Sequence, residues 1–131
     1  MALEIAMHVI NAGADAVKFQ IFNRDQLLSR SNPYFKEFGE IELLPEQWQK
    51  ILGQISSNNI EIIVEPYDIE SFHLAEKTGV VNGYKIPTAN IEETDLLKVV
   101  KQTKKSVYMG VGGAEWSEIK HAVSLFKSSK I

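Results

Sequence analysis

Segments typical of β-strands alternate with segments typical of α-helices along the chain, and this alternation restricts its fold more than any other feature. The predicted strands cover residues 15–22, 60–64, 83–86 and 106–109. Helices are predicted over residues 2–11, 69–78 and 94–102, from Pro45 onward, and around Ile119 to Phe126. Strands that alternate with helices are usually parallel, in an open doubly wound sheet or a closed (β/α)8 TIM barrel. We therefore predict an α/β fold of parallel βα repeats.

The first predicted strand carries a lysine opposite an apolar face. Successive side chains of a strand point to opposite faces, so Val17, Phe19 and Ile21 share one face. Lys18 and Gln20 share the other face. Strands of parallel sheets are usually covered on both faces, and a charge in covered space needs a partner. Lys18 is therefore the first candidate for a functional residue.

Charged residues end three of the predicted strands, namely Lys18, Glu65 and Lys85. Adjacent strands lie about 4.8 Å apart, so strands paired in chain order would place these side chains in a Lys–Glu–Lys row. Two lysines at the carboxyl ends of strands suit an anionic substrate, above all a phosphate or a carboxylate. Neutral donors and glycines at the same ends complete the candidate site: Gln20, Thr88, Gly110, Gly112 and Gly113.

Two other interpretations of this row remain open at the level of sequence. It could be a structural charge ladder in which Glu65 neutralises both lysines and nothing binds, because buried charges are usually paired. Alternatively, Lys85 could form a Schiff base, with Glu65 as a proton carrier. Nothing in the sequence favours the Schiff base.

A long polar segment, residues 23–42, follows the first strand without clear periodicity. Connections of this length are uncommon inside a compact domain and are often functional loops. Three aromatic residues within it, Tyr34, Phe35 and Phe38, could form a lid over the site or pin the loop to the body of the domain.

Composition excludes several classes of function. The chain has 131 residues, enough for one domain, and its net charge of −3 argues against nucleic acid as a partner. It has no cysteine, and no apolar run approaches the roughly 20 residues of a membrane span, so we expect no membrane partner and a cytoplasmic location. His8, His73 and His121 lack metal-ligand spacing, and no nucleotide-binding glycine motif is present.

Several of these segments, in this order, resemble the sialic acid synthase family, which makes N-acetylneuraminate and related nonulosonic acids. The first is Ala12 through Gln20, which ends in Lys-Phe-Gln and is similar to the family's second strand. The others are Leu44-Pro45-Glu46-Gln47-Trp48, Pro66-Tyr67-Asp68, Tyr84-Lys85-Ile86 with Thr88, and the turn around Gly112. The resemblance extends over nearly the whole chain.

The resemblance implies a TIM barrel that condenses phosphoenolpyruvate with an N-acetylated amino sugar, in sialic acid or surface polysaccharide biosynthesis. It also implies a divalent metal, Mn or Mg. Lys18, Lys85 and Thr88 match residues that hold phosphoenolpyruvate in that family, and Gln20 matches a residue beside the sugar site. The catalytic candidates are accordingly Lys18, Lys85 and Glu65, and the substrate-binding candidates are Lys18, Gln20, Lys85, Thr88 and Gly110.

The chain departs from the family at two of these positions. Glu65 stands where the family has Thr or Ser near the phosphate, and Gly110 stands where it has Ser. A carboxylate repels a phosphate unless the lysines offset its charge. Val111 and Gly113 also replace the Thr and Met of that turn. A non-catalytic module that binds an anion or a sugar is therefore the alternative function.

The length of the chain agrees with only part of such a barrel. A TIM barrel takes about 250 residues, and four predicted strands would correspond to about strands 2–5 of eight. The family's first strand would precede Met1, and its metal-binding histidines would follow Ile131. We therefore expect residues 1–131 to form a single partial-barrel domain that is inactive alone. Its unpaired strand edges and uncovered inner face predict a homo-oligomer, for example a dimer of two halves.

Overall fold

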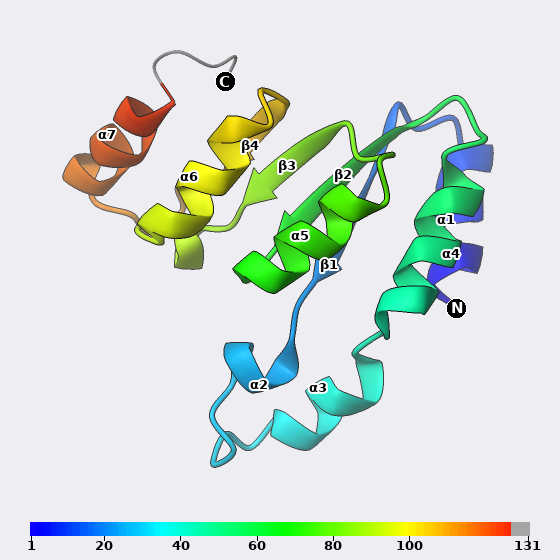
Figure 1. The fold of residues 1–131 in the computed structure, drawn as a ribbon, viewed down its shortest axis with the longest axis horizontal. Coiled ribbons are helices and arrows are strands. Elements are labelled where there is room, and N and C mark those ends of the chain that lie inside the picture. Colours follow the sequence, from blue (N-terminus) through cyan, green and yellow to red (C-terminus); the bar gives the residue numbers. More distant parts are fainter. Residues whose placement is uncertain (127–131) are drawn as a thin grey trace.

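Four parallel strands form the sheet, in the order β1-β2-β3-β4, in a computed structural model that describes residues 1–126 (Figure 1). The strands are β1 (Ala16–Ile21), β2 (Glu61–Pro66), β3 (Gly83–Ile86) and β4 (Ser106–Met109). Neighbours in sequence are therefore neighbours in the sheet throughout. This order is that of a (β/α)8 barrel, whereas a doubly wound sheet reverses its strand order part-way.

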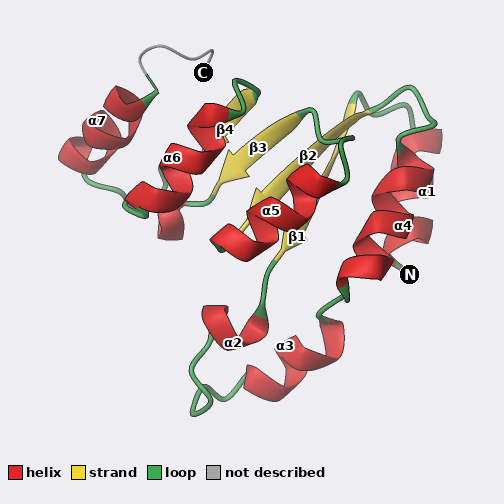
Figure 2. Cartoon of the chain, in the orientation of Figure 1, coloured by secondary structure: helices red, strands yellow, loops and turns green. Residues whose placement is uncertain are grey.

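Helices connect the strands, and most of them pack on one face of the sheet, whereas the two short helices between residues 24 and 41 lie beyond the end of the first strand (Figure 2). They are α1 (Ala2–Asn11), α2 (Arg24–Leu27), α3 (Phe35–Ile41), α4 (Pro45–Ile55), α5 (Ile69–Lys77), the 3-10 helix η1 (Thr88–Asn90), α6 (Thr94–Gln102) and α7 (Trp116–Leu125). Asp68 caps α5 as its sequence position predicts, because its side chain accepts from the Ser71 backbone N–H at 2.7 Å. Gly79, with φ +71°, follows the carboxyl end of α5 and stops the helix there.

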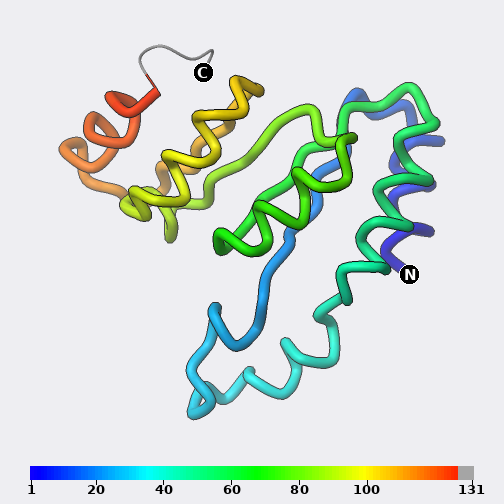
Figure 3. The backbone as a smooth tube through the Cα atoms, viewed as in Figure 1, coloured from blue at the N-terminus to red at the C-terminus, as the bar shows by residue number. Residues whose placement is uncertain are grey.

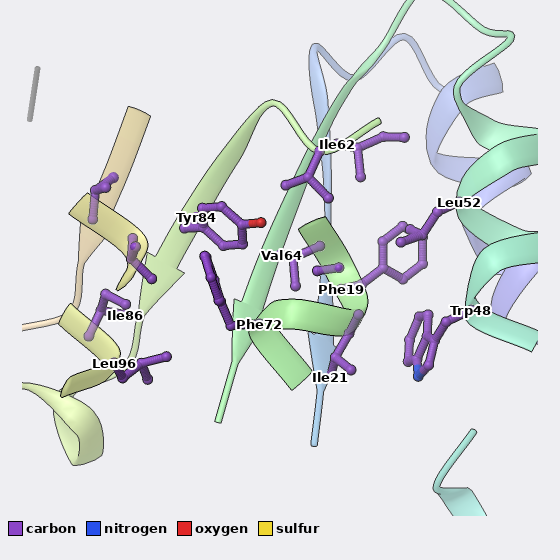
Figure 4. Close-up of a cluster of buried hydrophobic side chains, with 14 of the residues drawn as sticks. Phe19, Ile21, Trp48, Leu52, Ile62, Val64, Phe72, Tyr84, Ile86 and Leu96 are labelled. Carbon is purple, nitrogen blue, oxygen red and sulfur yellow. The ribbon is translucent and has the colours of Figure 1, made fainter. Parts of the chain in front are cut away.

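The hydrophobic core lies between the sheet and these helices (Figure 4). The alternation predicted for the first strand is confirmed, since Val17, Phe19 and Ile21 are all buried. Phe19 meets Trp48 of α4 edge to face, with ring centroids 5.8 Å apart, and Leu52 is fully buried on the same helix. The helices thus bury one face of each strand, and alternate residues are left on the other face.

The segment 23–42 differs from the prediction, because it contains the helices α2 and α3 (Figure 3). The side chain of Asn23 caps α2, and the Phe38 ring packs on Phe22 with centroids 5.4 Å apart. The Arg24 guanidinium lies 4.2 Å from the centre of the Phe35 ring. Helices this short depend on such contacts for their stability and are too short to show a clear helical periodicity. The sequence pattern therefore missed them. The contact of Phe38 with Phe22 agrees with a pin, whereas Phe35 packs on Arg24 within the segment itself and Tyr34 is exposed.

Two further details differ from the sequence-based predictions. β2 continues two residues past its predicted end, so Glu65 lies within the strand and Pro66 is its last residue. A proline is tolerated at this position because the next residue, Tyr67, donates its backbone N–H to Ile21 at 3.0 Å. In α7, Val123 is exposed although its helical spacing with Ile119 and Phe126 is typical of a buried stripe.

Candidate anion site on the open face of the sheet

The candidate residues lie on the face of the sheet opposite the helices. Lys18 and Gln20 alternate with the buried residues of β1, and the alternation places Glu65 and Lys85 on the same side of β2 and β3. The expectation that both faces of the strands are covered is wrong for the described residues. The Lys18 side chain is 37% exposed, because the helices pack on the other face only.

Three charged side chains from three neighbouring strands meet on this face. Glu65 accepts from Lys18 through Oε2 and from Lys85 through Oε1, the second contact at 2.5 Å. The row predicted from the strand ends is thus confirmed, with one difference in register. Gln20 lies opposite Glu65, whereas Lys18 lies opposite Ile63, so the Lys18 side chain reaches along the strand to its partner.

Burial and charge act against each other at the carboxylate. The Glu65 side chain is 1% exposed, and burial alone would raise its pKa. The hydrogen bonds and charges of Lys18 and Lys85 outweigh burial and hold the pKa of Glu65 below its ordinary value. Glu65 is therefore ionised at neutral pH. Two ammonium groups and one carboxylate leave the cluster with an excess of positive charge.

Tyr67 is a neighbour of the cluster that was not among the predicted site residues. Its hydroxyl accepts from Gln20 Nε2 at 2.8 Å. Burial and the charge of Glu65 raise the pKa of Tyr67, so its hydroxyl stays protonated and can donate. The signal was present, because Tyr67 follows Glu65 by two residues and period-two alternation places both on one face.

Thr88 and Gly110 form a second contact, beyond the ends of β3 and β4. Gly110 donates its backbone N–H to the Ile86 carbonyl at 2.8 Å. A Cβ at Gly110 would lie 3.2 Å from both the backbone nitrogen and Oγ1 of Thr88, closer than side chains usually pack. Gly110 thus permits the close approach of these two segments. The structure brings Thr88 and Gly110 together, while the Lys–Glu–Lys contact is made by Lys18, Glu65 and Lys85.

Two hollows adjoin the site at Tyr67. One, of about 330 Å³, is lined by Gln20, Phe22, Leu27, Leu28, Phe38, Ile41 and Tyr67, most of them apolar. The other, of about 470 Å³, lies between α2 and the starts of α5 and α6 and includes Asn90 and Glu93. Neither of these two hollows includes Lys18 or Lys85, whose side chains are 37% and 33% exposed, whereas the Glu65 carboxylate between them is buried.

Residues 1–126, the part of the chain that the structure describes, offer no evident metal site. Within that range, no group of three or more His, Cys, Asp or Glu side chains is placed to hold a metal ion. The three histidines, His8, His73 and His121, are exposed. No helix in the same range is long and apolar enough to cross a membrane.

Comparison with known proteins assigns the family. The NeuB family model matches residues 5–131. The chain belongs to the NeuB family. One relative, N,N'-diacetyllegionaminic acid synthase of Campylobacter jejuni, is 26% identical over 129 residues, which cover 88% of this chain and 38% of that protein. An uncharacterized protein of Methanocaldococcus jannaschii is also 26% identical, over 96% of this chain and 37% of its own length.

Solved structures of similar proteins confirm the partial barrel. The N-acetylneuraminic acid synthetase of Leptospira borgpetersenii, in complex with citrate, matches 97% of this chain and 44% of its own, with a TM-score of 0.88 and 25% identity. A putative spore coat polysaccharide biosynthesis protein E of Chromobacterium violaceum matches 94% of this chain and 39% of its own, with a TM-score of 0.78 and 30% identity. This NeuB-family chain therefore spans less than half the length of the relatives that it matches.

Proposed function

We propose that this NeuB-family chain is one partial-barrel domain, residues 1–131, of a synthase that condenses phosphoenolpyruvate with an N-acetylated amino sugar. Family membership and the names of two relatives, a legionaminic acid synthase and a sialic acid synthetase, support a synthase-like function. The product would be a nonulosonic acid for sialic acid or surface polysaccharide biosynthesis. Such an enzyme is a transferase, and we propose a cytoplasmic location for it.

The observation that carries this proposal is the convergence of two lysine ammonium groups, from the middle of β1 and from β3, on Glu65 near the carboxyl end of β2. In α/β barrels, substrates bind at this end. Lys18 and Lys85 would hold the phosphate or carboxylate of phosphoenolpyruvate and offset the charge that develops on the leaving phosphate. Thr88 and the backbone at Gly110 would add neutral contacts to the same anion. Glu65 would reduce the net positive charge of the cluster that it forms with the two lysines.

The position of Gln20 supports a place for the sugar. Its amide donates to Tyr67, and both residues border the apolar hollow of about 330 Å³. An N-acetyl group combines a small apolar methyl with a polar amide. It therefore suits an apolar hollow that has a Gln and a Tyr at its rim. We propose that the N-acetylated amino sugar binds at this side of the cluster.

A divalent metal, Mn or Mg, is part of this proposal because the chain belongs to the NeuB family. The residues that the structure describes do not fit one, since none of their acidic and histidine side chains form a group that could hold it. Any ligands would have to lie outside residues 1–126. The roles proposed for Lys18, Lys85 and Gln20 do not depend on the metal.

A second candidate function is a non-catalytic module that binds an anion or a sugar, and the burial of Glu65 between the lysines favours it. The Schiff-base alternative has less support. Lys85 donates to a carboxylate, and an ammonium in an ion pair is not a nucleophile. Trapping with borohydride and a keto acid would label Lys85 if that alternative held.

The test uses the longest protein that contains this chain. It is incubated with phosphoenolpyruvate, an N-acetylated hexosamine and Mn²⁺ or Mg²⁺, and the release of phosphate and the formation of sugar acid are measured together. We expect the two products in equal amounts, and a loss of at least about 100-fold in kcat/KM for Lys85→Ala, as for other groups that stabilise developing charge. A full-length protein that forms no sugar acid with any N-acetylated hexosamine would contradict the proposed reaction.

A further inference from the structure

The carboxylate of Glu65 already makes the contacts that a bound anion would make. Each of its two oxygens accepts from a different lysine, Oε2 from Lys18 and Oε1 from Lys85. A phosphate or carboxylate ligand would present its oxygens to the same two ammonium groups. The chain thus supplies its own anion at the centre of the site.

We propose that Glu65 is a built-in counter-ion that occupies the anion position between Lys18 and Lys85, so that an incoming oxyanion binds by displacing its carboxylate. The inference rests on the proposed function for the class of ligand, a small oxyanion. The further step is that the oxyanion competes with the Glu65 carboxylate for the two lysines, so that Glu65 determines how strongly the oxyanion binds. Glu65 is then a specificity-determining residue.

The exposure of the three side chains agrees with displacement from the solvent side. Glu65 is 1% exposed, while Lys18 and Lys85 are 37% and 33% exposed. An anion in solution can therefore approach both lysines without unfolding any part of the sheet. The lysine ammonium groups, on long flexible stems, can follow either partner.

The groups around Glu65 are the ones that its carboxylate would move away from, or toward, when an oxyanion displaces it. Among residues 1–126, Lys18 and Lys85 are the charged groups that act on it, Tyr67 is a titratable neighbour that its charge affects, and Gln20 lies opposite it in register. Both hydrogen bonds of its carboxylate go to the lysines. The helices pack on the far face of the sheet, so a rotation of the Glu65 side chain away from the lysines leaves the core intact.

A purely structural ion-pair ladder makes a different prediction. If Glu65 only holds the strands together, its replacement lowers stability and creates no affinity for anions. If it is a counter-ion, its replacement leaves two lysines that attract an anion from solution. Attraction between unit charges a few ångströms apart is strong enough near a protein surface to change affinity by at least about tenfold.

The test is a titration of the chain with sodium sulfate at constant ionic strength, balanced with sodium chloride and followed by NMR. Sulfate keeps its charge across the neutral range, so only protein groups can titrate. We expect Glu65→Gln to bind sulfate at least about tenfold more tightly than the wild type. Adding Lys85→Ala to Glu65→Gln should remove that gain.

Glu61→Gln is the matched control. Glu61 is an exposed residue on the same strand, and its substitution changes the net charge of the chain by the same amount. We expect its sulfate affinity to equal that of the wild type. An equal gain in Glu61→Gln would show a general charge effect and would overturn the proposal, as would an unchanged affinity in Glu65→Gln.

A second measurement covers the case in which Glu65→Gln does not fold. In the wild type with ¹³C-labelled Glu side chains, the carboxyl resonance of Glu65 should move as sulfate saturates the site, and that of Glu61 should not. A Glu65 resonance that stays fixed at saturation would overturn the proposal. These readouts need no turnover, so a gain in sulfate binding without sugar-acid synthesis would reject the proposed reaction and keep the role of Glu65.

Discussion

At the scale of single residues, Glu65 connects the chemistry of the open face with the stability of the fold, because its carboxylate joins side chains of β1 and β3 to β2. Its pKa is lower in the folded chain than its ordinary value, despite burial, because both lysines favour the charged form. A group with a lowered pKa in the folded state stabilises the fold above its unfolded pKa. That contribution is lost as the pH falls through the folded value.

Glu65→Gln should therefore cost about 1–2 kcal/mol of unfolding free energy at neutral pH, at the lower end for charged hydrogen bonds because the lysines are partly exposed. The difference from the wild type should shrink as the pH falls from the ordinary pKa of a glutamate through the lower pKa of Glu65 in the folded chain, where its carboxylate becomes protonated. Urea unfolding of both proteins across this pH range measures it. A difference that persists unchanged in acid would show that the ion pairs do not stabilise the fold.

The sequence identified some residues of the candidate site and missed others. The two groups differ in the kind of contact that their residues make. Lys18, Glu65 and Lys85 were predictable because strand periodicity and chain-order pairing place them together. Tyr67 was missed although period-two alternation from Glu65 places it on the same face, because the second strand was predicted to end at residue 64; its hydrogen bond with Gln20 is seen only in the structure. The role of Gly110 depends on its distance from Thr88, which only the structure gives.

At the scale of elements, the sequence pattern predicted the helices and strands of the βα repeat well and missed the two helices within the segment 23–42. The helix predicted over residues 94–102 coincides with α6, and the strand over 83–86 with β3. The helices α2 and α3, in contrast, depend on the packing of Phe38 on Phe22 and of Arg24 on Phe35. A segment that is ordered by tertiary contacts carries no periodic signal long enough to read.

The edge strands make a prediction of their own about association. In the described part of the chain, β1 and β4 form the two edges of the sheet, and the face with Lys18 and Tyr108 is open. Unpaired edges of a sheet favour pairing with another chain. We propose that the 131-residue chain self-associates, and sedimentation equilibrium should give a weight-average mass that rises with concentration to at least a dimer. A constant monomer mass at the highest concentration would contradict this.

At the scale of the whole molecule, the sequential order of parallel strands and the likeness to solved NeuB-type structures agree on part of a barrel. The inner face of a barrel is the side away from its helices, and that side carries the cluster, Gln20 and Tyr67. Sequence predicted this fold because βα alternation is a global property. It left open whether Glu65 pairs with both lysines or leaves them to a ligand, because that choice depends on register and burial.

We propose that Lys18 and Lys85 form an anion site of a sugar-acid synthase barrel. The most direct measurement is a phosphoenolpyruvate titration of the ¹⁵N-labelled Glu65→Gln chain by NMR, with Lys18→Ala and Lys85→Ala added singly as controls. We predict saturable chemical-shift changes at Lys18, Lys85 and Thr88. Each lysine substitution should lower the affinity for phosphoenolpyruvate that these changes report at least about tenfold. Shifts that are absent, or that persist unchanged without the lysines, would contradict the claim.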